Sequence, residues 1–163
     1  MKKIMVIVFC FIGYLSNAQT EGNKLYHPEA NPAKDIAAAI KKAKAEHKYV
    51  LLQGGGNWCS WCIEFARLCK ADAQLDSAIN AGFVWYHLNY SKENYNKEAF
   101  AKYGYPQRFG FPVFIILNEK GERLNTQNSE YLEDGKKSYD KAKVLEFLKK
   151  WSPEAFNPKL YSN

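Results

Sequence analysis

The stretch that decides the fold is residues 49–62, YVLLQGGGNWCSWC, which joins a short apolar run, three glycines and two cysteines. The run Tyr49–Gln53 has the length and composition of a buried strand, and the glycines after it are typical of a loop. Residues 63–69, IEFARLC, then predict a mostly buried helix. The cysteine pair is therefore expected between the end of a strand and the N-terminus of a helix.

The rest of the chain predicts alternating helices and strands. Helices are expected at 32–47, 72–80, 93–103 and from a cap at Ser138 or Asp140 to 151; strands are expected at 83–89, 111–117 and 123–126. The strand at 83–89 is predicted to be central, joined to the first by a parallel crossover, whereas Asn118–Gly121 predicts a hairpin turn. This order predicts an α/β fold with a central mixed β-sheet flanked by helices.

The N-terminal residues 1–18, MKKIMVIVFCFIGYLSNA, predict a secretory signal peptide, with two lysines, an apolar run and small residues at the cleavage site. The alternative is a membrane anchor, but the run is shorter than the roughly 20 residues of a spanning helix. We therefore expect cleavage near Ala18, a periplasmic or secreted protein and no stable membrane anchor. An N-terminal extension at 19–30, a folded domain at 31–152 and an irregular tail at 153–163 would follow.

Composition and charge argue against nucleic acid as a partner. The formal charge of +6 falls to +4 when the two lysines of the signal peptide are lost, and the remaining lysines form no basic stripe. Three cysteines remain, Cys59, Cys62 and Cys69, so they cannot all be paired internally. Secretion would place them where disulfides are chemically possible.

Metal and haem sites are poor explanations of the pair. Zinc needs four ligands, and this chain offers one Cys-x-x-Cys, a further cysteine and three scattered histidines (His27, His47 and His87). Haem attachment needs a histidine directly after the second cysteine, where this chain has Ile63. We expect no metal and no organic cofactor.

Two explanations of the cysteine pair remain: a disulfide that only stabilises the fold, called here a structural staple, and a redox centre. Closing so small a loop constrains the unfolded chain little, which disfavours the staple. A cysteine in the first turn of a helix lies at the positive end of the helix dipole, which lowers its thiol pKa from about 8.5. Cys59 is therefore the predicted nucleophile and Cys62 the resolving cysteine. Cys69 lies about 10 Å of helix rise beyond Cys62, too far for a bridge, and is predicted to be a buried core residue.

Together, Trp58-Cys59-x-x-Cys62 after an apolar strand and Phe111-Pro112 at the start of a later strand resemble the thioredoxin superfamily over about residues 31–151. The chain is most similar to small secreted bacterial thioredoxin-like proteins with a Trp-Cys-x-Trp-Cys centre. The resemblance implies a thioredoxin-like fold, a cis peptide bond before Pro112 that faces the cysteines, and pairing of the neighbouring backbone with an extended substrate.

Two positions depart from thioredoxin itself. Thioredoxins carry a buried acid six residues before the first cysteine, where this chain has Gln53, an amide that cannot accept a proton from the resolving thiol. The residues between the cysteines, Ser60 and Trp61, match neither strong reductants nor strong oxidants. The resemblance therefore implies a redox-active pair without indicating its potential or direction.

The resemblance implies a thiol-disulfide oxidoreductase that acts on protein thiols or disulfides and is recycled by a redox partner. Substrate contacts are expected at four residues: Trp58, Trp61, Phe111 and Pro112. Trp58 would chiefly shield the cysteines, whereas Trp61 would either offer an exposed platform or pack on a neighbouring loop. His87 is expected to be structural, and residues 105–108 to border the site, with Arg108 raising the local positive potential. The alternative function is a non-catalytic module that binds peptides.

Overall fold

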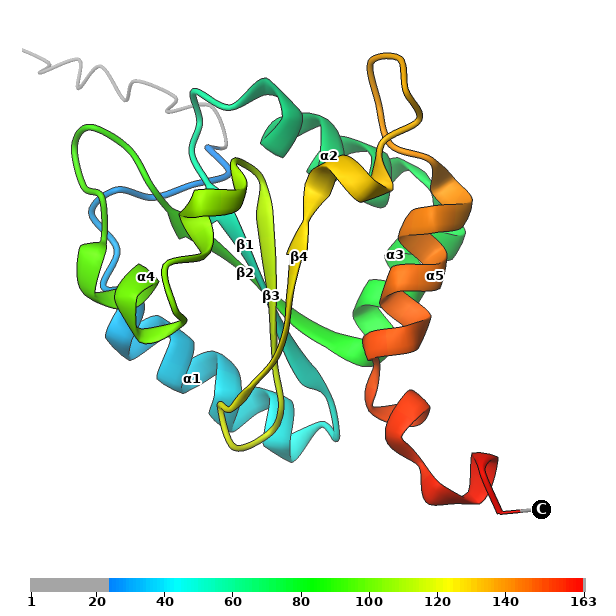
Figure 1. The fold of residues 1–163 in the computed structure, drawn as a ribbon. Helices are drawn as coiled ribbons and strands as arrows, with labels where there is room; N and C mark the ends of the chain where they lie inside the picture. Colours follow the sequence, from blue (N-terminus) through cyan, green and yellow to red (C-terminus); the bar gives the residue numbers. More distant parts are fainter. Residues whose placement is uncertain (1–23, 163) are drawn as a thin grey trace, which may run out of the picture.

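The computed structural model describes residues 24–162, so the predicted signal peptide lies outside the described residues. Within them, helices cover both faces of a four-stranded sheet (Figure 1). The strands are β1 (Tyr49–Gly55), β2 (Phe83–Asn89), β3 (Val113–Leu117) and β4 (Arg123–Asn128). The α-helices are α1 (Pro32–Ala45), α2 (Ser60–Ala71), α3 (Ala73–Gly82), α4 (Lys97–Lys102) and α5 (Lys141–Trp151); short 3₁₀ helices are η1 (Pro106–Phe109), η2 (Ser129–Leu132), η3 (Pro153–Phe156) and η4 (Pro158–Leu160).

The sheet is mixed, as predicted, in the order β2-β1-β3-β4. Strand β1 pairs with β2 in parallel and with β3 in antiparallel, and β3 pairs with β4 in antiparallel. The predicted central position of residues 83–89 is wrong, because β2 forms an edge of the sheet. Its middle residues are only half-buried, whereas every residue of β3 is buried. The apolar run of β2 contains Trp85 and Tyr86, whose rings tolerate partial exposure at an edge.

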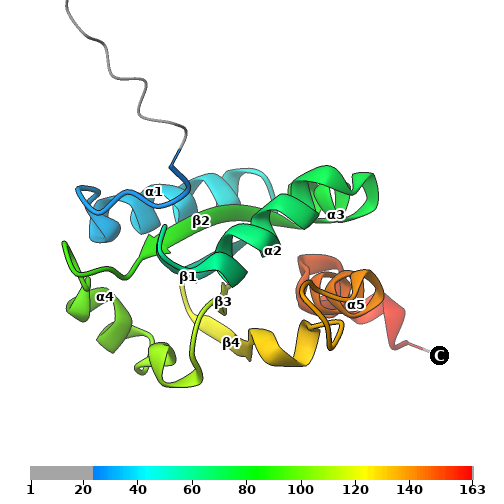
Figure 2. The same cartoon turned by 90° about the horizontal axis from the view of Figure 1, so that it is seen from above.

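The two faces of the sheet carry separate cores because side chains alternate along each strand. Val50 and Leu52 of β1 pack under α1 and α4, whereas Leu51 packs with the helices α2, α3 and α5. Figure 2 shows these two groups of helices on opposite sides of the sheet. The second core includes Phe65 of α2, so packing of this helix against the sheet sets the position of the cysteine pair at its N-terminus.

The predicted helix at 93–103 is too long, because α4 begins only at Lys97. Asn96 adopts the left-handed conformation with φ of 46°, and its side chain donates to the carbonyl of Asn89 over 2.8 Å. The side chain of Asn94 accepts from the backbone N–H of Asn96 over 2.9 Å. Such local side-chain bonds compete with helical backbone bonds and keep this segment as a turn.

Other local predictions agree with the structure, except in the tail. Asn31 caps α1 and, of the two proposed caps of α5, Asp140 is the one used. Gly121 closes the hairpin turn before β4 with φ of 80°. The tail is less irregular than predicted, since η3 and η4 form after residue 152. Among residues 24–162, no helix is long and apolar enough to cross a membrane.

Candidate redox site at the N-terminus of α2

The two cysteines form a disulfide where β1 leads into α2. The sulfur atoms are 2.08 Å apart and the Cα atoms 5.2 Å apart. Cys59 is the N-cap of α2, and its sulfur accepts a hydrogen bond from the backbone N–H of Cys62 over 3.1 Å. A thiolate at Cys59 would receive the same N–H and the positive end of the helix dipole.

The two sulfur-bearing residues differ in their access to solvent. Cys59 is 5% exposed and Cys62 is fully buried. An incoming substrate can therefore reach Cys59 first, which agrees with the order of attack that the sequence predicts. The burial of Cys62 is consistent with the predicted role of a resolving cysteine.

The peptide bond between Phe111 and Pro112 is cis, as the resemblance implies. Phe111 packs against the cluster formed by Tyr26, Cys59 and Cys62, which we call the cysteine cluster. The start of β3, with its cis bond, therefore lies at the same end of the sheet as the disulfide.

Trp58 forms the exposed aromatic surface beside the pair. Its ring meets that of Phe111 edge-on, with centroids 5.6 Å apart, and its Nε1 donates to the carbonyl of Tyr90 over 2.7 Å. These contacts fix the ring while 60% of the residue stays exposed. Such a fixed and exposed indole is suited to contact with a bound chain.

Trp61 packs on a neighbouring loop, which is one of the two alternatives left by the sequence. Its ring meets that of Tyr139 edge-on, with ring centroids 5.4 Å apart, and the Tyr139 hydroxyl donates to the carbonyl of Trp61 over 3.1 Å. The side chain is partly buried between the core and the cysteine cluster. It therefore contributes to holding α2 in place and offers less free surface than Trp58.

Gln53 lies fully buried directly beneath the pair. Its Nε2 donates to the carbonyl of Cys62 over 2.9 Å, whereas its Oε1 has no hydrogen-bond partner among residues 24–162. The amide thus ties β1 to the first turn of α2. It cannot take up a proton, so the position of the thioredoxin acid is structural in this chain.

Neither Cys69 nor Arg108 lies at the reacting sulfurs. Cys69 is a fully buried free thiol in the core, as predicted, and burial raises its pKa to about 12. The Arg108 guanidinium donates hydrogen bonds to the carbonyls of Gly104 and Tyr105. Its Cζ atom lies over the Phe109 ring, 4.3 Å from the ring centroid. Its contacts stay within its own loop, so they give no support for a role at the cysteines.

One residue of the site comes from the N-terminal extension and is not predicted from the sequence. Tyr26 is fully buried against the disulfide. Its backbone is held by Asn57, which accepts from the Tyr26 N–H over 3.1 Å and donates to the Tyr26 carbonyl over 2.7 Å. Nothing in the local sequence marks this tyrosine, because its contacts are made 31 residues away along the chain.

His87 is structural in its surroundings, as predicted. Its ring packs against that of Trp85, with ring centroids 4.8 Å apart, and meets that of Tyr26 edge-on, with centroids 5.5 Å apart. Burial, aided by the charge of Lys70, lowers its pKa from 6.5 to about 4. The imidazole is therefore neutral at physiological pH.

We expect His87→Gln to flatten the pH dependence of stability between pH 6.5 and about 4. In that window the unfolded chain binds a proton at this residue and the folded chain does not, so wild-type stability is full above pH 6.5 and falls toward pH 4. The part due to His87 is on the order of 3 kcal/mol. Urea unfolding of both proteins above pH 6.5 and near pH 4 measures it.

The matched control for this prediction is His47→Asn, which replaces an exposed histidine at φ of 55°, a conformation that asparagine tolerates. It should keep the pH dependence of the wild type. An equally steep loss of stability in His87→Gln would contradict the assignment to His87.

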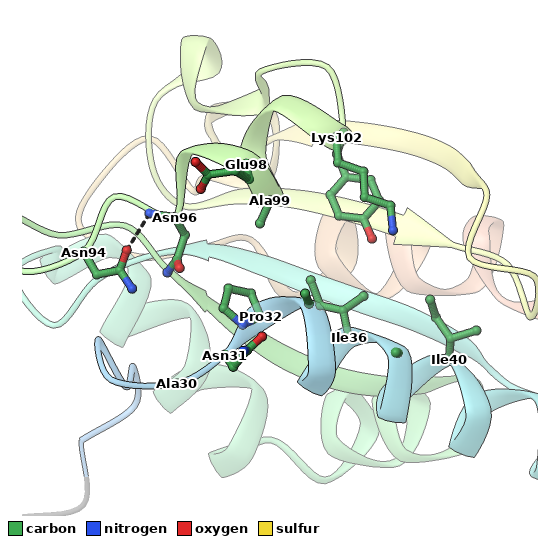
Figure 3. Close-up of a pocket in the computed structure, with 13 residues that line it drawn as sticks. Ala30, Asn31, Pro32, Ile36, Ile40, Asn94, Asn96, Glu98, Ala99 and Lys102 are labelled. Carbon is green, nitrogen blue, oxygen red and sulfur yellow. Dashed lines mark hydrogen bonds between the residues drawn. The ribbon is translucent and has the colours of Figure 1, made fainter.

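A separate cavity of about 520 Å³ lies away from the disulfide, between α1 and the segment that ends in α4 (Figure 3). Ile36 and Ile40 line one wall, and Asn96, Glu98 and Lys102 line the other. No predicted site residue contributes to it. In the described part of the chain, no three His, Cys, Asp or Glu side chains are grouped to hold a metal ion.

Comparison with known proteins identifies a family and a fold. The thioredoxin-like domain family matches residues 36–133. The structure is similar to a disulphide isomerase from Xylella fastidiosa Temecula1, with 23% identity, a TM-score of 0.69 and coverage of 78% of this chain and 96% of that chain. It is also similar to the oxidised C-terminal domain of DsbD from Neisseria meningitidis, with 20% identity, a TM-score of 0.53 and coverage of 75% and 97%. No curated protein matches the chain.

Proposed function

The chain belongs to the thioredoxin-like domain family, and from this premise we propose that it is a thiol-disulfide oxidoreductase acting on the cysteines of other proteins. The observation that carries the proposal is the Cys59–Cys62 disulfide at the first turn of α2, with the exposed ring of Trp58 beside it. The similar structures are those of a disulphide isomerase and a DsbD C-terminal domain, which is consistent with this chemistry.

The exchange needs only the two cysteines. In the reducing direction, the Cys59 thiolate attacks one sulfur of a substrate disulfide, forms a mixed disulfide and releases one substrate thiol. Cys62 then gives up its proton and attacks the Cys59 sulfur, which releases the second thiol. The pair loses two electrons and two protons, and the substrate disulfide gains them. The oxidising direction reverses these steps.

We further propose that the protein works in the periplasm or outside the cell and is recycled by a separate redox protein. The pattern of residues 1–18 and the intramolecular disulfide support this location. If the protein carries out net reduction or oxidation, a pair without a cofactor must exchange electrons with another thiol or disulfide after each cycle, which requires the recycling partner; isomerisation would leave the pair in its starting state.

The experiment that tests the function is a glutathione redox series on the purified mature protein, with the Cys59–Cys62 state followed by thiol trapping. We expect one reversible two-electron transition. A potential near about −270 mV would indicate a reductant, and one near about −120 mV an oxidant. A pair that never cycles would contradict the proposal and leave a binding module as the function.

Trp58→Ala tests whether this ring docks the substrate or only covers the cysteines. If it docks the substrate, kcat/KM for a protein disulfide should fall about tenfold or more, because a buried tryptophan contact contributes more than about 1.4 kcal/mol. The rate with glutathione disulfide should change little, since so small a substrate bypasses the docking surface. Steady-state kinetics with both substrates measures the difference.

Tyr161→Ala is the control for Trp58→Ala, because Tyr161 is 73% exposed in the C-terminal tail, far from the N-terminus of α2 (Figure 1). It should leave both rates unchanged. Equal losses with the protein and the small substrate in Trp58→Ala would instead assign Trp58 to shielding the cysteines.

A further inference from the structure

The N-terminal segment places a tyrosine hydroxyl against the buried sulfur of the pair. A Cβ atom at Gly55 would lie 2.4 Å from the Cys62 sulfur and 2.8 Å from the Tyr26 hydroxyl oxygen. The Cys62 sulfur and the Tyr26 hydroxyl oxygen therefore both lie directly over the backbone of Gly55. Only glycine leaves the room that brings both of them against β1.

While the disulfide is closed, the Tyr26 hydroxyl forms no hydrogen bond within 3.5 Å among residues 24–162, although the Gln53 side chain lies close enough to interact with it. Two other polar atoms near it are also buried without a partner, Gln53 Oε1 and His87 Nε2. A buried hydroxyl with no close partner costs free energy, so its interactions in the oxidised state are weaker than one well-formed hydrogen bond. Burial raises the pKa of Tyr26, so the hydroxyl keeps its proton and remains a donor.

We propose that the Tyr26 hydroxyl donates a hydrogen bond to the Cys62 sulfur once the disulfide is reduced, and so favours the dithiol over the disulfide. A sulfur in a disulfide is a weak acceptor, whereas a thiolate or thiol freed from its bond to Cys59 is a better one. The hydroxyl therefore gains a close acceptor only in the reduced state. Tyr26 is then the group that favours the thiolate of Cys62 in a site where Gln53 cannot act as an acid or base.

This inference rests on the proposed function, since it requires that the pair cycles. The reaction used to test it is balanced by glutathione. Two glutathione thiols form one glutathione disulfide, the bond between Cys59 and Cys62 breaks, and two electrons and two protons pass to the pair. Tyr26 keeps its own proton throughout.

The test compares Tyr26→Phe with the wild type in the glutathione redox series. Phenylalanine keeps the ring in the cysteine cluster and removes only the hydroxyl. The equilibrium constant for forming the disulfide should rise about three- to tenfold, the effect of one hydrogen bond. A tenfold rise corresponds to a potential about 30 mV more negative for a two-electron couple.

Tyr103→Phe is the matched control, because Tyr103 is also buried with an unpaired hydroxyl but packs with α1 and α4 on the other face of the sheet. It should leave the equilibrium constant unchanged. An unchanged or lower constant in Tyr26→Phe, in a pair that still cycles, overturns the inference and leaves the proposed function intact. A wild-type pair that does not cycle overturns both.

A second measurement separates hydrogen bonding from packing. In a Cys59→Ser background, the ultraviolet absorbance of the thiolate reports the pKa of Cys62, because burial keeps Cys69 protonated up to pH about 12. Adding Tyr26→Phe should raise the pKa of Cys62, whereas adding Tyr103→Phe should not. An equal pKa with and without the Tyr26 hydroxyl would contradict the inference.

Discussion

Replacing Cys59 by serine is expected to reduce thiol-disulfide exchange to the background rate of the assay. Cys59 is the more accessible of the two cysteines and the N-cap of α2, so we expect the exchange to start from its sulfur. The loss should be at least about a thousandfold, as for removal of a nucleophile in other enzymes. Reduction of a protein disulfide, followed by thiol trapping, measures it.

Cys62→Ser should give a different result, because it leaves the attacking sulfur and removes the resolving one. Mixed disulfides between Cys59 and the substrate should then accumulate and should disappear when a reductant is added. Cys69→Ala is the control, since this thiol is buried in the core away from the disulfide. Mixed disulfides that form on Cys62 in the Cys59→Ser protein would reverse the assigned order of attack.

Phe65→Ala is expected to cause the largest loss of stability, about 3–5 kcal/mol of the free energy of unfolding. Phe65 is fully buried on the face of α2 that meets the sheet. The centroid of its ring lies 4.3 Å from the ring centroid of Phe114 and 5.1 Å from that of Tyr139. Truncation removes these contacts and leaves a cavity beneath the helix that carries the cysteines. Urea unfolding of the oxidised protein measures the loss.

The control on the same helix is Ile63→Ala, because Ile63 is 40% exposed. Its replacement should cost less than about 1 kcal/mol, the usual range for a partly exposed side chain. A loss of under 1 kcal/mol in Phe65→Ala as well would mean that α2 is not held by this contact with the sheet.

Local patterns in the sequence predicted most of the elements and the position of the pair. The buried strand before the glycines, the cap at Asn31, the two alternative caps Ser138 and Asp140 (of which Asp140 is used), and the hairpin at Gly121 all depend on contacts within a few residues. Such contacts can be inferred from residue type and spacing. The start of α4 was misplaced because the side chain of Asn96 bonds to Asn89, which lies outside the helix.

The order of the strands and the surroundings of the sulfurs were decided by the tertiary structure. The run of residues 83–89 is as apolar as a central strand, and only pairing of β3 with β1 places it at the edge. Packing of Trp61 on Tyr139 settles an alternative that its own segment leaves open.

The sequence by itself determined that Cys59 and Cys62 stand at the start of a helix, since strand, glycine loop and helix follow one another along the chain. The tertiary structure alone decided that Tyr26 is buried against the two cysteines. Asn57 and Gly55 bring this tyrosine to the sulfur of Cys62 through contacts between distant segments. Such contacts depend on the packed shape of the whole domain, which the spacing of residues along the chain does not record.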